Sequence, residues 1–269
     1  MRILVKIGGA QLEQPEPRAQ LCADLARARA EGHEIVVVHG GGNQIRTVTR
    51  ALGLQEQYVD GLRVTDAATA EVVLMVLGGQ VNRTLVAALQ QAGVQAVGLS
   101  GADGATFSAR KLEREGSDLG YVGAVDTVRP QLVHSLLAAG YVPVIATVAP
   151  GVRSRAQDPF YNLNADHAAG PLCKALCCDA VLFLTDVEGV LDASKQRIPQ
   201  LTPESSAELV QSGVAKGGML PKLEAAWMAA RENPLALVKI APAGAQDAVL
   251  AALRQNTGTS FRMMEVSRG

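Results

Sequence analysis

Apolar and polar positions alternate in blocks along this chain. Short runs rich in Val and Ile, each with the length and composition of a buried parallel strand, recur from one end to the other. Between them, Ala- and Leu-rich segments place apolar residues at helical spacing, as at Leu21, Leu25 and Ala28. This alternation predicts an α/β fold with a mainly parallel sheet and helices on both of its faces. The predicted strands lie at 3–7, 35–38, 94–99, 142–148, 181–184 and 237–240.

Two segments depart from this rhythm. Gly78 and Gly79 interrupt an otherwise helical stretch over 65–91, and two adjacent glycines predict a kink or a break there. From Ala105 to Thr127 the chain mixes charged and β-prone residues around a Glu-Gly pair. This second pattern predicts a hairpin that stands away from the main sheet, where it is able to cover a site.

Composition narrows the classes of function. A chain of 269 residues with 48% hydrophobic content can bury a large core. The net charge of -1, with both signs scattered, argues against a nucleic-acid partner and favours small molecules. We expect no stretch of membrane-spanning length and no signal segment, hence a cytoplasmic protein. The loop at 150–159 is the nearest thing to a boundary, so we expect one domain with lobes at 1–155 and 156–269.

The four cysteines give no sign of a metal site or a disulfide framework. Disulfides are rare in the reducing cytosol, and a core of this size needs none. The spacing lacks the CxxC pairs or matching histidines of a zinc site, so we expect no metal ligands in the protein. The cysteines are Cys22, Cys173, Cys177 and Cys178.

Glycines and a lysine stand at the ends of the first two predicted strands. Lys6 is followed by Gly8 and Gly9, and the second strand by His39 and the run 40–42 of three glycines. A glycine-rich turn from strand to helix exposes backbone N–H groups at the positive end of the helix, and a lysine adds a full charge. These features predict binding of a phosphate or carboxylate. We expect His39 to pack or hydrogen-bond locally and not to act as a base.

Three residues further along suit phosphoryl transfer. The planar fork of Arg63 matches a carboxylate, with an exposed surface arginine as the competing interpretation. Lys222 follows a Gly-Gly pair in the half of the chain opposite Lys6, and two such cations can offset charge on a migrating phosphoryl group. A carboxylate between them, such as Asp166, would hold both. The plainer alternatives are a helix-start aspartate and a solvated lysine.

Other nucleotide-binding patterns are missing. The glycines lack the GxGxxG spacing and the acidic residue of a nicotinamide-dependent oxidoreductase. The segment 217–222 lacks the GxxxxGK[ST] spacing of a P-loop NTPase. No Ser-His-Asp or Cys-His arrangement is apparent either. A carboxylate acceptor explains this, because it is already a competent nucleophile and needs no general base.

Six short segments in order resemble the acetylglutamate kinases of the amino acid kinase family, over about residues 1–259. The resemblance implies a three-layer αβα sandwich. It also implies transfer of the γ-phosphoryl group of ATP to the side-chain carboxylate of N-acetyl-L-glutamate, giving N-acetyl-L-glutamyl 5-phosphate in arginine biosynthesis. The segments are Lys6 to Gly9, His39 to Gly42, Gly61 to Thr65, Asn162 to Asp166, Thr185 to Leu191 and Gly217 to Lys222.

Roles for individual residues follow from the same resemblance. Lys6 and Lys222 would stabilise the transition state, and Asp166 would orient them. The acyl amino acid would contact Gly41, Gly42, Arg63 and Asn162. Mg²⁺ would accompany ATP, because phosphates rather than a protein cage usually hold it. The nucleotide would contact Gly9, Asp186, Val187, Glu188, Gly189, Val190, Leu191, Val214, Ala215 and Lys216.

The sequence also bears on the oligomeric state, and it leaves two alternative functions open. Arginine-inhibited members of the family generally carry an additional N-terminal helix that joins dimers into a ring of six, whereas strand residues begin here at Ile3. We therefore expect a homodimer. One alternative is a carrier-protein-linked aminoadipate kinase of lysine biosynthesis, whose relatives vary around 61–64. The other is a non-catalytic amino acid or nucleotide sensor, which is expected to lose at least one of Lys6, Asp166 and Lys222.

Overall fold

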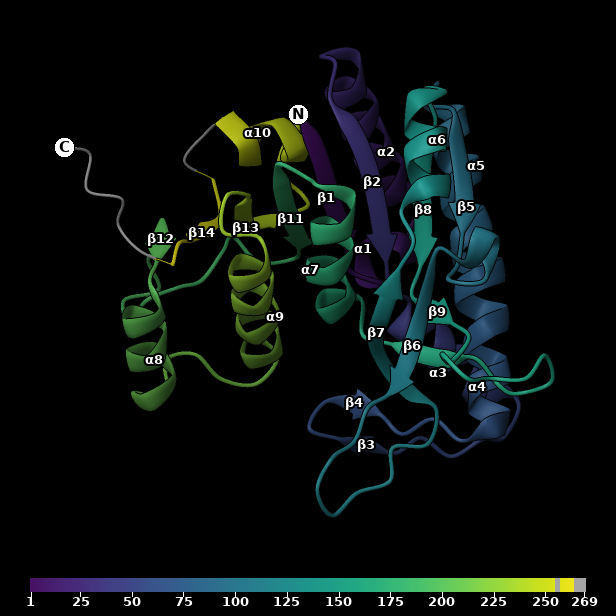
Figure 1. Ribbon diagram of the computed structural model, residues 1–269. Coiled ribbons are helices and arrows are strands. Elements are labelled where there is room, and N and C mark those ends of the chain that lie inside the picture. Colours follow the sequence, from purple (N-terminus) through teal and green to yellow (C-terminus); the bar gives the residue numbers. More distant parts are fainter. Residues whose placement is uncertain (255–256, 264–269) are drawn as a thin grey trace.

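The molecule is built around an eight-stranded sheet. The computed structural model describes residues 1–254 and 257–263, and Figure 1 shows the sheet crossing the molecule with helices on both sides. Neighbouring strands are parallel except for one antiparallel pair, β13 and β14. The predicted mainly parallel sheet is therefore confirmed. In spatial order the strands are β12 (Gln200–Leu201), β14 (Thr259–Phe261), β13 (Leu237–Pro242), β11 (Ala180–Thr185), β1 (Arg2–Ile7), β2 (Glu34–His39), β8 (Val142–Ala146) and β5 (Ala96–Leu99).

Alternating side chains of β1 enter two separate cores. Ile3, Val5 and Ile7 pack on one face of the sheet, while Leu4 packs on the other. A strand buried on both faces reads as a continuous apolar run, which is why the sequence revealed it. The helices on the two faces make the three-layer αβα sandwich that was predicted. The first face is covered by α2 (Pro15–Ala30), α3 (Gly42–Ala51), α4 (Ala67–Val73), α5 (Asn82–Gln91) and α10 (Ala248–Arg254), and the second by α6 (Gln131–Ala138), α7 (Ala165–Leu176) and α9 (Met219–Glu232).

The two adjacent glycines lie in a π-helical segment, η1 (Leu74–Val81), which joins α4 to α5. The helix therefore widens at Gly78 and Gly79 and continues, instead of breaking as one of our alternatives had it. Val76 and Leu77 remain buried through this segment, so core packing holds the chain helical despite the glycines. Single π turns inside α-helices often lie next to functional sites.

The resulting helix over 67–91 corrects one expectation. By length and composition it is apolar enough to cross a membrane, with a mean hydropathy of 1.6, so a stretch of that length does exist. Its buried side chains pack against the main sheet, and 44% of its most apolar window is buried inside the structure. Core helices of globular domains pass the same test, so the segment is weak evidence for a membrane span.

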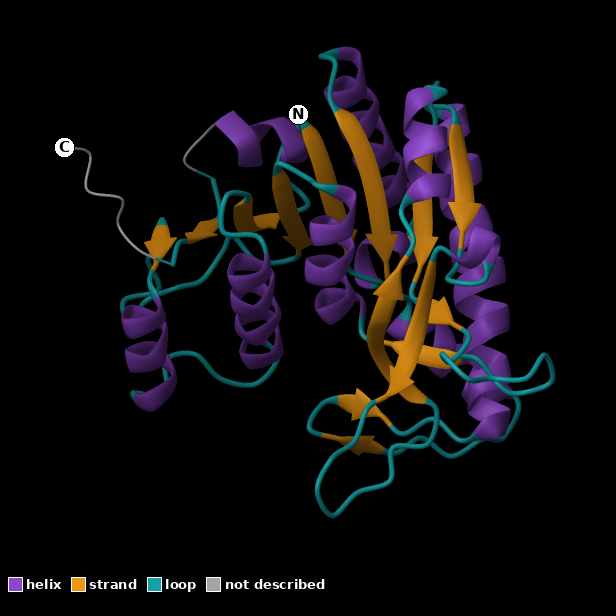
Figure 2. Ribbon diagram, viewed as in Figure 1, coloured by secondary structure: helices purple, strands orange, loops and turns teal. Residues whose placement is uncertain are grey.

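A second, four-stranded sheet stands beside the main one. It contains the antiparallel pair β6 (Phe107–Lys111) and β7 (Val122–Val128), which confirms the predicted hairpin. β10 (Tyr161–Leu163) and β9 (Val148–Ala149) complete it, and β3 (Tyr58–Val59) and β4 (Leu62–Arg63) form a small hairpin nearby. Figure 2 shows these strands together at one end of the main sheet. The division into two lobes stays a prediction. The short helices are α1 (Ala10–Glu13), η2 (Asp103–Ala105) and α8 (Pro203–Gln211).

Gly98 of β5 leaves room for the side chain of Asn82. A Cβ atom at Gly98 would lie 1.9 Å from Asn82 Oδ1, and hydrogen bonds from Asn82 to His39 and to the carbonyl of Val144 prevent an easy retreat. We expect Gly98→Ala to lower the free energy of unfolding by about 1–3 kcal/mol, the usual cost of overpacking, in a urea titration. Gly79→Ala is the control, because its Cβ would meet nothing within 4 Å. Equal losses in both variants would contradict the steric cause.

Candidate active site

One cavity of about 700 Å³ opens at the carboxyl edge of the main sheet. Its walls include the residues that directly follow β1, β2 and β8, namely the glycine pair 8–9, the glycine run 40–42 and Thr147. The end of β11 adds Thr185 and Asp186. The carboxyl ends of parallel strands meet at this edge, which is where open α/β sheets bind their ligands.

The cavity brings together residues that are far apart in the sequence. Those of the predicted site that line it are Lys6, Gly9, Gly41, Gly42, Arg63, Asn162, Asp166, Asp186, Val187 and Lys222. Others assigned to the nucleotide lie outside its described lining: Glu188, Gly189, Val190, Leu191, Val214, Ala215 and Lys216. Among these, Val190 and Ala215 are buried, whereas Glu188 and Lys216 are exposed. The roles of all these residues stay predictions.

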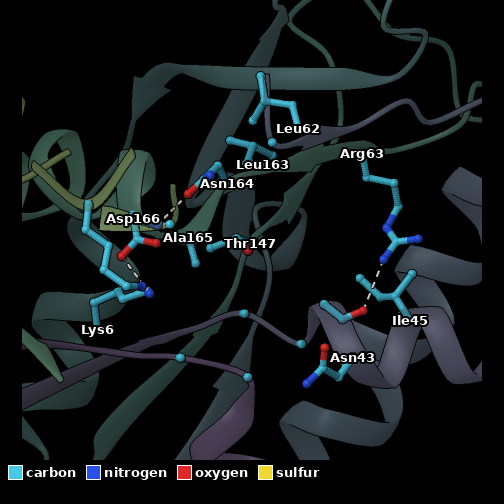
Figure 3. A pocket seen from close by; sticks show the side chains of 18 of the residues that line it. Lys6, Asn43, Ile45, Leu62, Arg63, Thr147, Leu163, Asn164, Ala165 and Asp166 are labelled. Atoms are coloured by element: carbon cyan, nitrogen blue, oxygen red, sulfur yellow. Dashed lines mark hydrogen bonds and ion pairs between the residues drawn. The ribbon is translucent and has the colours of Figure 1, made fainter. Parts of the chain in front are cut away.

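Lys6, which is buried, forms an ion pair with the half-buried Asp166 at one end of the cavity. The distance from Lys6 Nζ to Asp166 Oδ1 is 2.6 Å, and Figure 3 shows the two side chains pointing toward each other. Lys6 lies at the end of β1. Asp166 lies in the first turn of α7, whose N-cap residue Asn164 accepts a hydrogen bond from the Asp166 backbone N–H at 2.8 Å. Asp166 is therefore both a helix-start residue and the counterion of Lys6.

The charge of Lys222 acts on both members of this pair. Burial lowers the pKa of Lys6, Asp166 opposes that change, and Lys222 adds to it. Burial raises the pKa of Asp166, but the charges of Lys6 and Lys222 outweigh burial and hold it below its ordinary value. Lys222 comes from the first turn of α9 and lines the same cavity. Two ammonium groups and one carboxylate thus share a single space, although they come from opposite halves of the chain.

The two glycine turns touch each other beside this cluster. A Cβ atom at Gly9 would lie 3.0 Å from the Cα of Gly41, and one at Gly41 would lie 2.6 Å from Leu77 of the π-helical segment. Side chains are therefore excluded for lack of space. Gly41 is the N-cap of α3, and that helix has no side-chain cap and no acidic residue in its first turn. Its positive end is left available for an anion.

His39 hydrogen-bonds to the glycine run from the buried side. It is fully buried, and burial lowers its pKa to about 4. Its Nε2 lies 3.0 Å from Asn82 Nδ2, which is a donor, so Nε2 accepts and Nδ1 donates to the carbonyl of Gly40 at 3.0 Å. A neutral, locally bonded His39 agrees with our expectation that it is not a base.

Arg63 lies at the other end of the cavity in Figure 3, and it is not an exposed surface arginine. Its Nη1 donates to Glu56, and its Nη2 donates to the carbonyl of Gly42 at 3.1 Å. Its guanidinium carbon lies 4.9 Å from the centre of the Tyr58 ring. The fork of Arg63 therefore already holds a carboxylate of the protein.

Sequence reasoning missed Glu56, Tyr58 and Arg46. Tyr58 and Arg46 line the cavity, and Glu56 is the ion-pair partner of Arg63. Arg46 was detectable in principle, because it lies one helical turn after the glycine run and so projects from the same helix start. Glu56 was harder to find, because its contact with Arg63 depends on how the short β3–β4 hairpin folds back.

The side chains that the structure describes do not fit a resident metal ion. Within residues 1–254 and 257–263, no three His, Cys, Asp or Glu side chains are grouped so that they would hold one. The best-placed carboxylate, Asp166, is committed to Lys6.

Comparisons with known proteins agree with this geometry. The model of the amino acid kinase family matches residues 1–239. An acetylglutamate kinase from Solibacter usitatus is 43% identical over 249 residues, which are 93% of this chain and 94% of that protein. N-acetylglutamate synthase from Neisseria gonorrhoeae, complexed with coenzyme A and N-acetyl-glutamate, has a TM-score of 0.84 at 22% identity, covering 98% of this chain and 59% of that one. Carbamate kinase from Giardia lamblia, bound to AMP-PNP, has a TM-score of 0.70 at 14% identity, covering 98% of each chain. At such identities the two structures show the shared fold alone.

Proposed function

This chain belongs to the amino acid kinase family, and we propose that it transfers the γ-phosphoryl group of ATP to the side-chain carboxylate of N-acetyl-L-glutamate. The product is N-acetyl-L-glutamyl 5-phosphate, an intermediate of arginine biosynthesis. The observation that carries the proposal is one cavity with the Lys6–Asp166 pair toward one end and Arg63 toward the other. Lys222 lines the same cavity, and its charge acts on both members of the pair. The Solibacter usitatus relative, 43% identical over 93% of this chain, supports the same activity.

The chemistry requires alignment and charge stabilisation, not a base. The attacking carboxylate is already ionised at neutral pH, and phosphoryl transfer leaves little covalent work for the protein. Lys6 and Lys222 offset negative charge on the migrating group and on the oxygens at either end of its path. Asp166 holds the Lys6 ammonium in place through its 2.6 Å contact. His39, buried and neutral, positions the glycine run.

The remaining residues divide between the two substrates. Backbone N–H groups of Gly9, Gly41 and Gly42 face the transferring phosphoryl group and the acid. Arg63 and Asn162 bind the acyl amino acid. The nucleotide contacts Asp186 and Val187 in the cavity wall, and it also contacts the segments 188–191 and 214–216. Mg²⁺ enters on the phosphates of ATP, since the described part of the chain offers it no cluster of three His, Cys, Asp or Glu side chains.

The proposal extends to partners and place. We propose a homodimer with small-molecule substrates, and static light scattering measures the assembly. A hexamer in that measurement would contradict it. We propose the cytoplasm as the compartment, because an ATP-dependent biosynthetic step draws on cytoplasmic substrates. Fractionation of cells that express a tagged chain would check this.

The deciding experiment compares ATP turnover with four acceptors side by side: N-acetyl-L-glutamate, L-glutamate, L-aspartate and N-acetyl-L-aspartate. We expect the acetylated five-carbon acid to have the highest kcat/KM, because the cavity must place one carboxylate at Lys6 while the rest of the molecule reaches Arg63. Trapping the acyl phosphate with hydroxylamine separates true transfer from contaminating ATPase activity. A preference for an unacetylated or four-carbon acid would overturn the proposal.

A further inference from the structure

Three arginines meet one carboxylate at the Arg63 end of the cavity. Arg63 Nη1 contacts Glu56 Oε1, while the Nε atoms of Arg46 and Arg50 lie 3.5 Å and 3.6 Å from Glu56 Oε2. Tyr58 adds a hydrogen bond to Glu56 from its hydroxyl at 3.3 Å. One carboxylate cannot balance three guanidinium groups, so this arginine cluster retains an excess of positive charge and attracts a further anion.

Arg63 alone is poorly placed to hold a second carboxylate by both of its oxygens. One end of its fork donates to Glu56 and the other donates to the carbonyl of Gly42. While those bonds persist, the paired geometry that makes an arginine–carboxylate contact strong is not open to a ligand. Another donor is needed for the second oxygen of an incoming carboxylate.

Arg46 supplies that donor. It comes from α3 one turn after the glycine run, lines the cavity, and keeps 41% of its side chain exposed. Its contacts are long, 3.5 Å to Glu56 and 3.3 Å from Nη1 to Asn43 Oδ1, so the guanidinium can turn toward a new anion at little cost. Arg50 contacts the same Glu56 but is 71% exposed and is absent from the described lining of the cavity.

We propose that Arg46 is a specificity-determining residue that binds the substrate carboxylate not phosphorylated in the reaction, jointly with Arg63. The inference rests on the proposed function, because it takes the substrate to be a dicarboxylate with one acid group at Lys6. Glu56 is the positioning residue that keeps the two guanidinium groups together. Burial raises the pKa of Glu56, but Arg63, Arg46 and Arg50 outweigh it and hold the carboxyl ionised.

The test compares Arg46→Gln with Arg50→Gln. Each variant removes one positively charged contact of Glu56, and of the two arginines only Arg46 lines the cavity. We expect Arg46→Gln to raise the KM for N-acetyl-L-glutamate about tenfold, the scale of one charge-assisted hydrogen bond, with kcat and the KM for ATP nearly unchanged. Arg50→Gln should leave all three constants near their original values. Equal increases in both variants, or an unchanged KM in Arg46→Gln, would overturn the proposal.

A substrate analogue tests which carboxylate is recognised. 4-Acetamidobutyrate keeps the carboxylate to be phosphorylated and lacks the other one, so Arg46→Gln should leave its kcat/KM unchanged. A tenfold loss with this analogue as well would overturn the assignment. If Arg46→Gln fails to fold, as judged by its thermal midpoint, Arg46→Lys replaces it. That variant keeps the charge and should give a smaller rise in KM.

Calorimetry separates this inference from the proposed function. If the unaltered chain binds N-acetyl-L-glutamate without phosphorylating it, the proposed function fails and the inference is still decided by titration. In that case a Kd about ten times larger in Arg46→Gln than in Arg50→Gln supports the inference. Equal Kd values, or no binding by the unaltered chain, overturn it.

Discussion

In Lys222→Met we expect kcat to fall by about a hundredfold or more, the scale of losing one charge contact made in a transition state. Methionine keeps much of the length of lysine and removes its charge. Lys222 lines the cavity, and its charge already reaches both Lys6 and Asp166. The KM for ATP should change less, because this ammonium group acts mainly on the charge that develops during transfer.

Steady-state kinetics with ATP and N-acetyl-L-glutamate measure this effect. Lys174→Met is the matched control, since Lys174 is an exposed lysine of α7 outside the described lining of the cavity. It should keep the original kcat. An unchanged kcat in Lys222→Met would remove Lys222 from the mechanism. A higher KM for ATP at unchanged kcat would assign it to ground-state binding of the nucleotide instead.

Features that depend on local pattern were predictable from the sequence. The core strands appear as apolar runs because each is buried on both faces, as Ile3 and Leu4 show on opposite sides of β1. Lys6 is conspicuous because a lysine inside such a run is costly to bury without a partner. An aspartate directly before a helix is typical of an N-cap, and Asp66 in that position accepts a hydrogen bond from the Thr69 backbone N–H at 2.8 Å.

Features that depend on tertiary packing were not predictable. The glycine pair at 78–79 allowed a break, and only the burial of Val76 and Leu77 in the core shows why the chain stays helical there. The carboxylate in the fork of Arg63 is Glu56, and no local signal assigns that pairing. The consequence for function is direct: both ends of the Arg63 fork are already engaged by Glu56 and by the carbonyl of Gly42, which is why we propose that Arg46 shares in binding the substrate carboxylate.

In Asp166→Asn we expect a large fall in kcat and a shift of its alkaline limb to lower pH. Lys6 must be protonated to stabilise the transferring group, so activity declines as the pH rises through its pKa. Burial lowers that pKa and Asp166 raises it. With the carboxylate gone, burial and the repulsion from Lys222 act unopposed, and the pKa of Lys6 falls further. The loss at neutral pH should be about tenfold or more, since the variant leaves a buried ammonium without its counterion.

The effect of Asp166→Asn on the free energy of unfolding should depend on acidic pH, whereas its effect on kcat depends on alkaline pH. Asp166 has a folded pKa below its ordinary 3.8, so its contribution to stability is present above that pH and is lost as the pH falls through the lower folded value. Urea titrations should therefore show that the difference between the original chain and Asp166→Asn shrinks below about pH 3.8.

Asp166→Glu separates charge from geometry. It restores the carboxylate on a longer side chain, so its alkaline limb should return toward the original pH even where kcat stays reduced by misplacement. A pH–rate profile of kcat for the three proteins measures both effects. If the alkaline limb stays in place in Asp166→Asn, the protonation of Lys6 does not govern turnover. The Lys6–Asp166 ion pair then only holds α7 against β1. If Asp166→Glu behaves like Asp166→Asn, the position of the carboxylate matters more than its charge.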